Sequence, residues 1–202
     1  MGSIGIMGGT FNPIHNGHLL IAENAREQLS LEQVLFIPNG APPHKRDKRI
    51  EDGGHRLRMV ELAIADNPAF VADDRELREK RVSYSYLTLR ELHEELPQEE
   101  LYFIMGGDSL RDFKTWYRPQ IICEHATLAA AVREDCDRAR LLGFARELEQ
   151  LFGARVRLIQ TPELSVSSSG LRERVRAGET IRYQVPEAVR AYIEKNHLYV
   201  EG

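Results

Sequence analysis

The sequence has few cysteines and no long apolar run. Only Cys123 and Cys136 occur among its 202 residues, and their spacing matches neither a zinc site nor a disulfide framework. No stretch approaches the roughly 18 consecutive apolar residues of a membrane helix, and no basic signal region precedes the first apolar segment. These absences favour a soluble protein of the reducing cytoplasm, with no membrane partner and no structural metal.

An excess of basic residues is also missing. The chain has 27 Lys and Arg against 31 Asp and Glu, so its formal net charge is -4. Domains that bind nucleic acid usually concentrate positive charge on one face, so we expect no nucleic-acid partner. The length suits a single domain over residues 1–202, in which the basic residues serve local anionic groups.

Short apolar runs alternate with segments of helical spacing. The expected strands are 3–7, 33–37, 69–72, 101–105, 127–132 and 156–159, and the expected helices are 17–29, 55–65, 84–96, 137–152, 168–177 and 186–196. This alternation predicts an α/β fold of the Rossmann-like kind, a doubly wound parallel sheet with helices on both faces. Ligands of such folds bind beyond the carboxyl ends of the strands, where the strand order reverses.

The segment GGTFNPIHNGH at residues 8–18 follows the first expected strand. Gly8 and Gly9 allow the backbone to approach a ligand closely, and the free N–H groups at a helix start attract anions. His15 and His18 lie three residues apart, so a helix that begins near Asn16 lets both imidazoles face one phosphate. A tight turn with a solvated histidine is the alternative, but the coincidence of these features favours a phosphate site.

Two later segments also place polar or aromatic side chains at element ends. VSSSGLR at residues 166–172 puts three hydroxyls and Arg172 at a helix start, which suits either a second anion site or simple capping. GGDS at 106–109 follows a strand, with Asp108 as a cap or a ribose ligand. Trp116 and Tyr117 come next and suit either ring stacking or core packing.

Three further features offer cations or a hydroxyl. The long loop at 39–54 is rich in Pro, Gly and charge, and contains APPHKR at 41–46 with Lys45, while Arg56 follows as a further candidate for phosphate. Ser85 lies at an expected helix start, where it suits an N-cap. Arg133 directly follows the strand expected at 127–132. Each is also compatible with an ordinary surface role.

The segment at 8–18 resembles the Gly-x-Phe-Asp/Asn-Pro-x-His-x-Gly-His signature of the nucleotidyltransferase superfamily, which is related to the class I aminoacyl-tRNA synthetases. Within that superfamily, residues 3 to about 199 resemble the bacterial nicotinate mononucleotide adenylyltransferases. PPHK at 42–45, YSYLTL at 84–89 and TWY at 115–117 carry this likeness. The second signature, Ile-Ser-Ser-Thr-x-Ile-Arg, is matched with the substitutions Val166, Ser169 and Leu171.

The resemblance implies transfer of AMP from ATP to nicotinate mononucleotide in NAD biosynthesis, giving nicotinate adenine dinucleotide and pyrophosphate. It implies direct in-line attack without a covalent intermediate, and Mg²⁺ that binds with ATP rather than in a protein site. The catalytic residues would be His15, His18, Lys45 and Arg172. The ATP contacts would come from Gly8, Gly9, Thr10, Phe11, His18, Gly106, Asp108, Ser167, Ser168, Ser169 and Arg172. The mononucleotide contacts would come from Thr10, Asn12, Lys45, Ser85, Trp116, Tyr117 and Arg133.

Other functions stay open at this point. Pantetheine-phosphate adenylyltransferases share the first motif, although they are shorter and typically have Thr at position 15. A cytidylyltransferase that acts on a small phosphorylated alcohol and a regulatory module that binds ATP without turnover are further alternatives. The sequence also leaves open a homodimer and the choice between nicotinate and nicotinamide mononucleotide. The remaining histidines, His44, His55, His93, His125 and His197, lack metal-binding spacing, and Glu91, Glu94 and Glu95 are expected to contact solvent.

Overall fold

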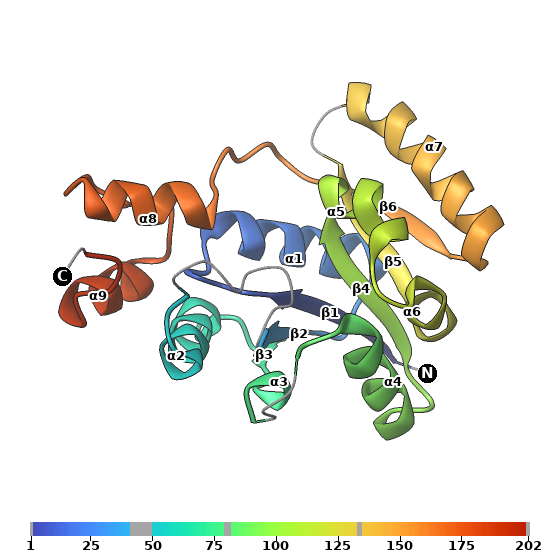
Figure 1. The fold of residues 1–202 in the computed structure, drawn as a ribbon, viewed down its shortest axis with the longest axis horizontal. Coiled ribbons are helices and arrows are strands. Elements are labelled where there is room, and N and C mark those ends of the chain that lie inside the picture. Colours follow the sequence, from blue (N-terminus) through green and yellow to red (C-terminus); the bar gives the residue numbers. More distant parts are fainter. Residues whose placement is uncertain (1, 41–49, 79–81, 133–134, 201–202) are drawn as a thin grey trace.

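A computed structural model describes residues 2–40, 50–78, 82–132 and 135–200 and gives the chain one parallel sheet (Figure 1). The strands are β1 (Ser3–Gly9), β2 (Gln33–Pro38), β3 (Phe70–Ala72), β4 (Glu100–Gly106), β5 (Thr127–Val132) and β6 (Val156–Gln160). Their order is β3-β2-β1-β4-β5-β6, and every pair is parallel. The chain therefore winds outward from β1 in both directions, which creates a switch point between β1 and β4. The predicted doubly wound fold is confirmed.

The helices expected from sequence periodicity are also present. They are α1 (Asn16–Leu29), α2 (Gly53–Ile64), α4 (Ser85–Glu95), α7 (Asp135–Phe152), α8 (Ser168–Arg176) and α9 (Glu187–Lys195). The short helices α3 (Arg75–Arg78) and α6 (Pro119–His125) and the 3-10 turn η1 (Phe113–Thr115) were not expected, and for α5 (Gly107–Asp112) the sequence indicated only a helix start near Asp108. One or two helical turns are too short to display an amphipathic repeat.

Two apolar cores cover the two faces of the sheet. Successive side chains of a strand point to opposite faces, so Val34 and Phe36 of β2 enter one core while Leu35 and Ile37 enter the other. Helices α1, α2, α8 and α9 contribute to the first core, and α4, α5, α6 and α7 contribute to the second. Burial on both faces explains why these strands are continuous apolar runs rather than alternating ones.

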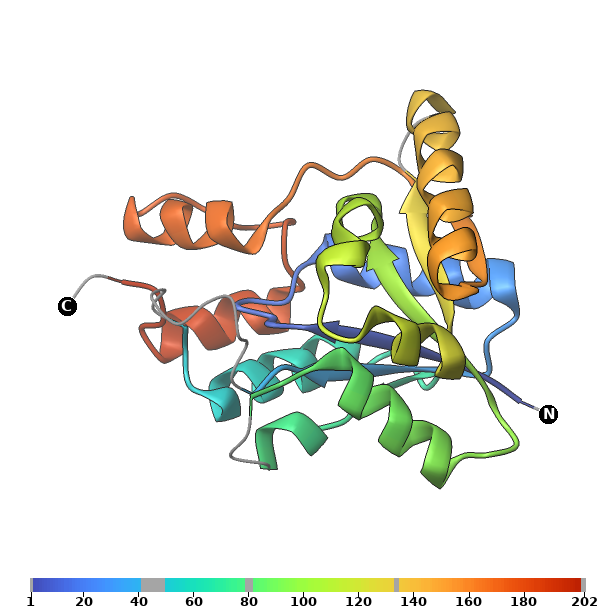
Figure 2. The same cartoon turned by 45° about the vertical axis from the view of Figure 1, so that its right-hand side comes forward.

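The C-terminal part of the chain returns to the carboxyl end of β1. After β6 the chain crosses the molecule to α8, which lies with α9 and α2 at the end opposite the N-terminus (Figures 1 and 2). The N–H of Asn16 at the start of α1 donates to the carbonyl of Gln184 at 3.0 Å, and its side-chain amide donates to the carbonyl of Tyr183 at 2.7 Å. The start of α1 is therefore held by a segment more than 160 residues away in the sequence.

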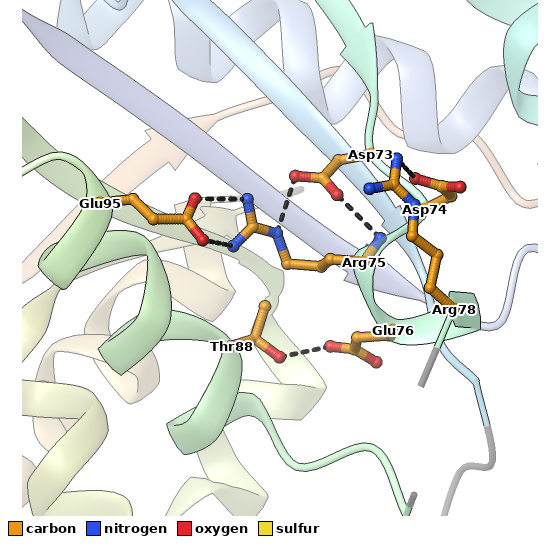
Figure 3. Close-up of polar contacts among 7 residues, drawn as sticks. All are labelled: Asp73, Asp74, Arg75, Glu76, Arg78, Thr88 and Glu95. Atoms are coloured by element: carbon orange, nitrogen blue, oxygen red, sulfur yellow. Dashed lines mark hydrogen bonds and ion pairs between the residues drawn. The ribbon is translucent and has the colours of Figure 1, made fainter. Parts of the chain in front are cut away.

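A polar network joins α3 to α4 (Figure 3). Arg75 donates two hydrogen bonds to Glu95, at 3.2 and 3.1 Å, and one to Asp73 at 2.8 Å. Burial disfavours charge on Arg75, but the hydrogen bonds to Glu95 and Asp73 outweigh it and raise the pKa of the guanidinium. The Thr88 hydroxyl donates to Glu76 at 2.6 Å. The expectation that Glu95 contacts only solvent is wrong, because a partner on the unpredicted helix α3 engages it.

Cys123 lies in the second core with a free thiol, and burial raises its pKa to about 11. The side chain of Cys136 lies outside the described residues. Within the part of the chain that is described, no helix combines the length and the apolar character that a membrane crossing requires.

Candidate active site

A cavity of about 430 Å³ lies beyond the carboxyl end of β1, against the starts of α1 and α8. It brings together segments from the two ends of the chain, because both helices begin at this edge of the sheet. The lining residues with polar side chains are Thr10, Asn12, His15, His18, Thr161, Ser167, Ser168, Ser169 and Arg172. Among the described residues, the lining contains two imidazoles and a guanidinium but no carboxylate, so this part of the cavity suits an anion.

The turn after β1 is tightly folded around Phe11. This residue has a φ of +47° and is 1% exposed, so a bulky side chain is held in the left-handed region that usually favours glycine. A Cβ atom at Gly9 would lie 3.0 Å from the Phe11 ring, which explains the glycine there. The Phe11 ring in turn meets the His18 ring edge-on, with centroids 5.1 Å apart. The buried Phe11 ring therefore supports the ring of His18 through direct packing.

The two histidines stack at the start of α1. Their ring centroids are 3.7 Å apart and the ring planes are inclined by 26°. The backbone N–H of His15 donates to Nδ1 of His18 at 3.2 Å. Since Nδ1 accepts this bond, a neutral His18 carries its proton on Nε2, which makes Nε2 a hydrogen-bond donor. The sequence predicted that both rings can serve one ligand, and the structure brings them into contact in one cavity.

Gly17 lies between the two histidines in α1. A Cβ atom at this position would lie 3.0 Å from Nδ1 and 3.1 Å from Cε1 of His15. That separation is shorter than ordinary van der Waals contact, so a larger residue would displace the His15 ring. The glycine of the signature is thus explained by side-chain packing within the motif.

The start of α8 faces the histidines across the cavity. Ser167 caps the helix by accepting from the N–H of Gly170 at 3.2 Å, and the Ser168 hydroxyl donates to the Pro13 carbonyl at 2.8 Å. Arg172 donates from Nη1 to the Asn12 carbonyl at 2.8 Å, while its Nε is buried without a hydrogen-bond partner among the described residues. Ser167 therefore caps the helix, as the simpler interpretation predicted, and all three serines line the cavity.

A second, smaller cavity of about 80 Å³ has Gly8, Ser85 and Trp116 in its lining. Ser85 is the first residue of α4, and its predecessor Tyr84 is the N-cap, so the predicted capping role of Ser85 is wrong. Trp116 packs against Phe113, with ring centroids 5.3 Å apart, and remains partly exposed. The predicted core packing of Trp116 is therefore confirmed, and stacking of its ring on a ligand stays a prediction.

Asp108 occupies a third cavity, of about 100 Å³, that shares Gly106 with the first. Its side chain is 81% exposed and accepts from Arg111 at 3.1 Å, and the helix N-cap is Gly106. The carboxylate is therefore free of a capping role and accessible from solvent. Tyr117 is 55% exposed and lines none of these three cavities; its ring lies 5.0 Å from that of Tyr84.

Several expected contacts need correction or fall outside the described residues. Lys45 and Arg133, with His44, belong to the ranges that are not described. The suggestion that Arg56 binds phosphate is wrong in this structure: Arg56 is 2% exposed and donates to the carbonyls of Glu51 and Thr10. Burial lowers its pKa, although Tyr199 and Asp52 oppose the shift. Arg56 therefore supports the backbone at Thr10, in the turn after β1, and at Glu51.

Sequence reasoning also missed part of the cavity wall. Ile50, Thr161 and Leu164 line it, although none belongs to a motif. Thr161 follows β6 and is buried, with its hydroxyl donating to the Val132 carbonyl at 3.3 Å. Its place directly after a strand at the carboxyl edge was the one available signal, because such positions adjoin ligands in doubly wound folds.

A metal site is not built from the described side chains. No group of three or more His, Cys, Asp or Glu residues in those parts of the chain could hold a metal ion. His93 and His125 do approach each other, with ring centroids 4.8 Å apart, and His55 Nδ1 lies 2.9 Å from the Tyr192 hydroxyl. These contacts lie away from the residues that line the first cavity.

Comparison with known proteins gives matches along the chain. Residues 6–174 match the family described as "Cytidylyltransferase-like". The chain is 46% identical over 200 residues to the "Probable nicotinate-nucleotide adenylyltransferase" of Lachnoclostridium phytofermentans, which covers 99% of this chain and 100% of that relative. It is 45% identical over 196 residues to the protein of the same name from Desulfitobacterium hafniense, covering 97% of this chain and 95% of the relative.

A solved structure agrees with the fold. "Plasmodium falciparum nicotinic acid mononucleotide adenylyltransferase complexed with NaAD" superposes with a TM-score of 0.80 at 21% identity, and 98% of each chain is covered. That identity supports the shared fold, while the full-length identity above 40% to the curated relatives supports a shared family. The chain therefore belongs to the cytidylyltransferase-like family and, within it, to the nicotinate-nucleotide adenylyltransferases.

Proposed function

We propose that this chain transfers AMP from ATP to nicotinate mononucleotide and releases pyrophosphate. The observation that carries the proposal is the cavity in which the stacked pair His15 and His18 faces Arg172 and the start of α8. Helix starts, imidazoles and a guanidinium all stabilise phosphate oxygens, and the described part of the cavity lining holds no carboxylate that would repel them. Membership of the family supports the same reaction.

The reaction proceeds by direct attack of the mononucleotide 5'-phosphate on the α-phosphorus of ATP. The bond from this phosphorus to the α-β bridging oxygen breaks as the new one forms, and the electron pair leaves on pyrophosphate. The attacking oxygen is already an anion, so no general base is required and no covalent intermediate forms. Such chemistry depends mainly on alignment and charge stabilisation. His18 would donate from Nε2 to a phosphate oxygen, because the backbone of His15 occupies its Nδ1.

The two substrates occupy neighbouring parts of the carboxyl edge. The ATP phosphates lie in the first cavity, against Thr10, His18, Ser167–Ser169 and Arg172, and the adenosine extends past Gly106 toward Asp108. The mononucleotide lies toward the second cavity, with its pyridine ring on Trp116 and its polar groups near Ser85 and Asn12. Gly8 and Gly9 keep the intervening turn free of side chains. Tyr117, Lys45, Arg133 and Phe11 keep the roles that the resemblance implies.

Magnesium enters with ATP in this proposal. The donor set of the first cavity fits an anion rather than a bare cation, so the triphosphate oxygens and water would supply its ligands. When bound, Mg²⁺ neutralises charge on the phosphate oxygens. A single domain in the cytoplasm, acting as a monomer or a homodimer, completes the proposal.

The test is pyrophosphate release from ATP and Mg²⁺ with three acceptors in parallel: nicotinate mononucleotide, nicotinamide mononucleotide and phosphopantetheine. We expect strong release with nicotinate mononucleotide. Release with phosphopantetheine alone would replace the acceptor while keeping the chemistry. ATP binding without release in any reaction would overturn the enzymatic proposal and favour a regulatory module.

A further inference from the structure

Asn12 accepts three hydrogen bonds, one at its backbone carbonyl and two at its side-chain oxygen. Its carbonyl accepts from Arg172 Nη1 at 2.8 Å, and its side-chain Oδ1 accepts from the backbone N–H of Glu51 at 3.3 Å and from the Tyr199 hydroxyl at 2.9 Å. Asn12 is only 2% exposed, yet it lines the first cavity. Because two donors bind Oδ1 of this buried side chain, the orientation of the Asn12 amide is defined.

The identity of these partners fixes which end of the amide is which. A backbone N–H can only donate, so the atom that faces Glu51 must be the oxygen of Asn12. The Tyr199 hydroxyl must then be the donor in its own contact, since an amide oxygen only accepts. Both contacts engage Oδ1, which leaves the two N–H groups on Nδ2 as the donors that this side chain can offer to a ligand.

Tyr199 is built to hold this contact. It lies near the C-terminal end with a φ of +65° and is 6% exposed. Burial and then the Glu51 carboxylate raise the pKa of its hydroxyl well above the usual range, so it keeps its proton and can donate at any physiological pH. Its other contact is Met59 Sδ, at 3.9 Å. The hydroxyl has only one proton, and it donates this proton to Asn12. Its contact with the Met59 sulfur is therefore van der Waals packing and not a hydrogen bond.

We propose that Tyr199 is a positioning residue for the adenylyl transfer. Its hydroxyl orients the Asn12 amide so that the N–H groups of Asn12 face the anionic nicotinate mononucleotide. This inference rests on the proposed function. Without the hydroxyl, the weaker 3.3 Å contact from Glu51 is the remaining restraint on Oδ1, and the amide can rotate to present its oxygen to a phosphate. An oxygen facing an anion repels it.

The chain contains a matched control in Tyr192. Its hydroxyl also makes one side-chain contact in the C-terminal region, to His55 at 2.9 Å, but neither residue lines the first cavity. Tyr199→Phe and Tyr192→Phe each remove one hydroxyl and keep the ring. Comparing them separates the loss of a hydrogen bond in general from the loss of the one that orients Asn12.

The first measurement is steady-state pyrophosphate release with each substrate varied in turn. For Tyr199→Phe we expect kcat/KM for nicotinate mononucleotide to fall about tenfold, the effect of losing one oriented hydrogen bond. The KM for ATP should change less than about twofold, and the two variants should melt at similar temperatures. Equal losses for both variants, or a loss in Tyr199→Phe that follows its melting temperature, would overturn the inference.

A double-mutant cycle tests whether Tyr199 acts through Asn12. Asn12→Ala combined with Tyr199→Phe should be no slower than Asn12→Ala alone, because the hydroxyl would have nothing left to orient. Additive losses from the two substitutions would show that Tyr199 acts independently and would remove Asn12 from the explanation.

A spectroscopic readout separates this inference from the proposed reaction. The Asn12 side-chain amide signal in a ¹H–¹⁵N spectrum, assigned by its loss in Asn12→Ala, should shift in Tyr199→Phe and stay in place in Tyr192→Phe. An unshifted signal in Tyr199→Phe would overturn the orienting role whatever the enzyme does. An unaltered protein that releases no pyrophosphate would refute the proposed function, while the amide signal would still report the orientation.

Discussion

At the level of single residues, a backbone contact decides the chemistry of His18. The N–H of His15 occupies Nδ1, so the neutral ring has one possible donor, Nε2. Sequence spacing predicted that the two histidines approach each other, because residues three apart share a helix face. The spacing carried no information on the tautomer of His18. The tautomer depends on the contact between the His15 N–H and the His18 ring, which forms only because the helix begins at Asn16.

Replacing His18 tests its role directly. We expect His18→Ala to lower turnover about 100-fold or more, the scale of losing one stabiliser of developing phosphate charge. The fold should persist, because the helix start keeps its contact from Asn16 to Gln184. Single-turnover pyrophosphate release and a melting curve provide the measurement. His93→Ala is the control, since His93 lies outside the first cavity; near-normal turnover in a folded His18→Ala protein would exclude His18 from the mechanism.

Trp116 tests the separation of the two substrates. Trp116→Ala should raise the Kd for nicotinate mononucleotide about tenfold, because the variant loses a stacking surface, while the Kd for an ATP analogue stays nearly unchanged. Calorimetric titration with each ligand measures both values. Trp116→Phe, which keeps an aromatic ring, should recover part of the loss. Equal weakening for both ligands would instead indicate that Trp116 supports the fold through its contact with Phe113.

At the level of elements, α1 contains a glycine that weakens the helix but leaves room for the His15 ring. Gly17 is a poor helix former, and the structure explains its presence by the His15 ring 3.0 Å from where a Cβ atom would lie. Gly143 of α7, in contrast, has no atom within 4 Å of such a Cβ. The two glycines therefore provide a matched pair in which only one is required by side-chain packing.

Replacing each glycine by alanine should have a different effect: Gly17→Ala should lower activity, and Gly143→Ala should raise stability. Gly17→Ala should lower turnover about ten- to hundredfold by displacing His15, since small misplacements of catalytic groups have effects of that size. Its stability should stay close to that of the unaltered protein, because helix propensity offsets the steric contact. Gly143→Ala should gain up to about 1 kcal/mol of stability with full activity. Denaturant titration and turnover assays compare them; full activity in Gly17→Ala would contradict the packing argument.

At the level of the whole molecule, Cys123 reports on global unfolding. It belongs to α6 and is buried in the core that α6 forms with α4 and α7, and burial raises its pKa to about 11. At pH 8 about one thiol in a thousand would be ionised in the folded state, compared with a substantial fraction in the unfolded state. The sign follows: the folded form loses stability as the pH rises above the ordinary thiol pKa, because only the unfolded form ionises easily.

Labelling measures this prediction. In a Cys136→Ser background, alkylation of Cys123 by iodoacetamide at pH 8 should be slow in buffer and fast above the denaturant midpoint, as followed by mass spectrometry. Saturating ATP should slow the labelling further, because a ligand that binds only the folded state lowers the unfolded population. Rapid alkylation of the native protein would contradict the buried position.

The sequence by itself determined the order of strands and helices, the parallel sheet and the clustering of the signature segments at one edge. These follow from local periodicity and from the geometric rule that parallel strands end on the same side. Short helices such as α3 and α6 escaped because they span too few turns to show a period. Motif residues were found wherever the spacing was local, as for His15 and His18.

Only the tertiary structure decided how distant residues support the site. The burial of Arg56 against backbone carbonyls, the bond from Tyr199 to Asn12 across 187 positions, and the placement of Thr161 all depend on long-range packing. A cation or hydroxyl in a loop looks the same in sequence whether it meets water, a ligand or a carbonyl. Its partner depends on which segment packs against it. For Asn12 and the start of α1 this segment follows β6, whereas Arg56 bonds to the carbonyls of Thr10 and Glu51.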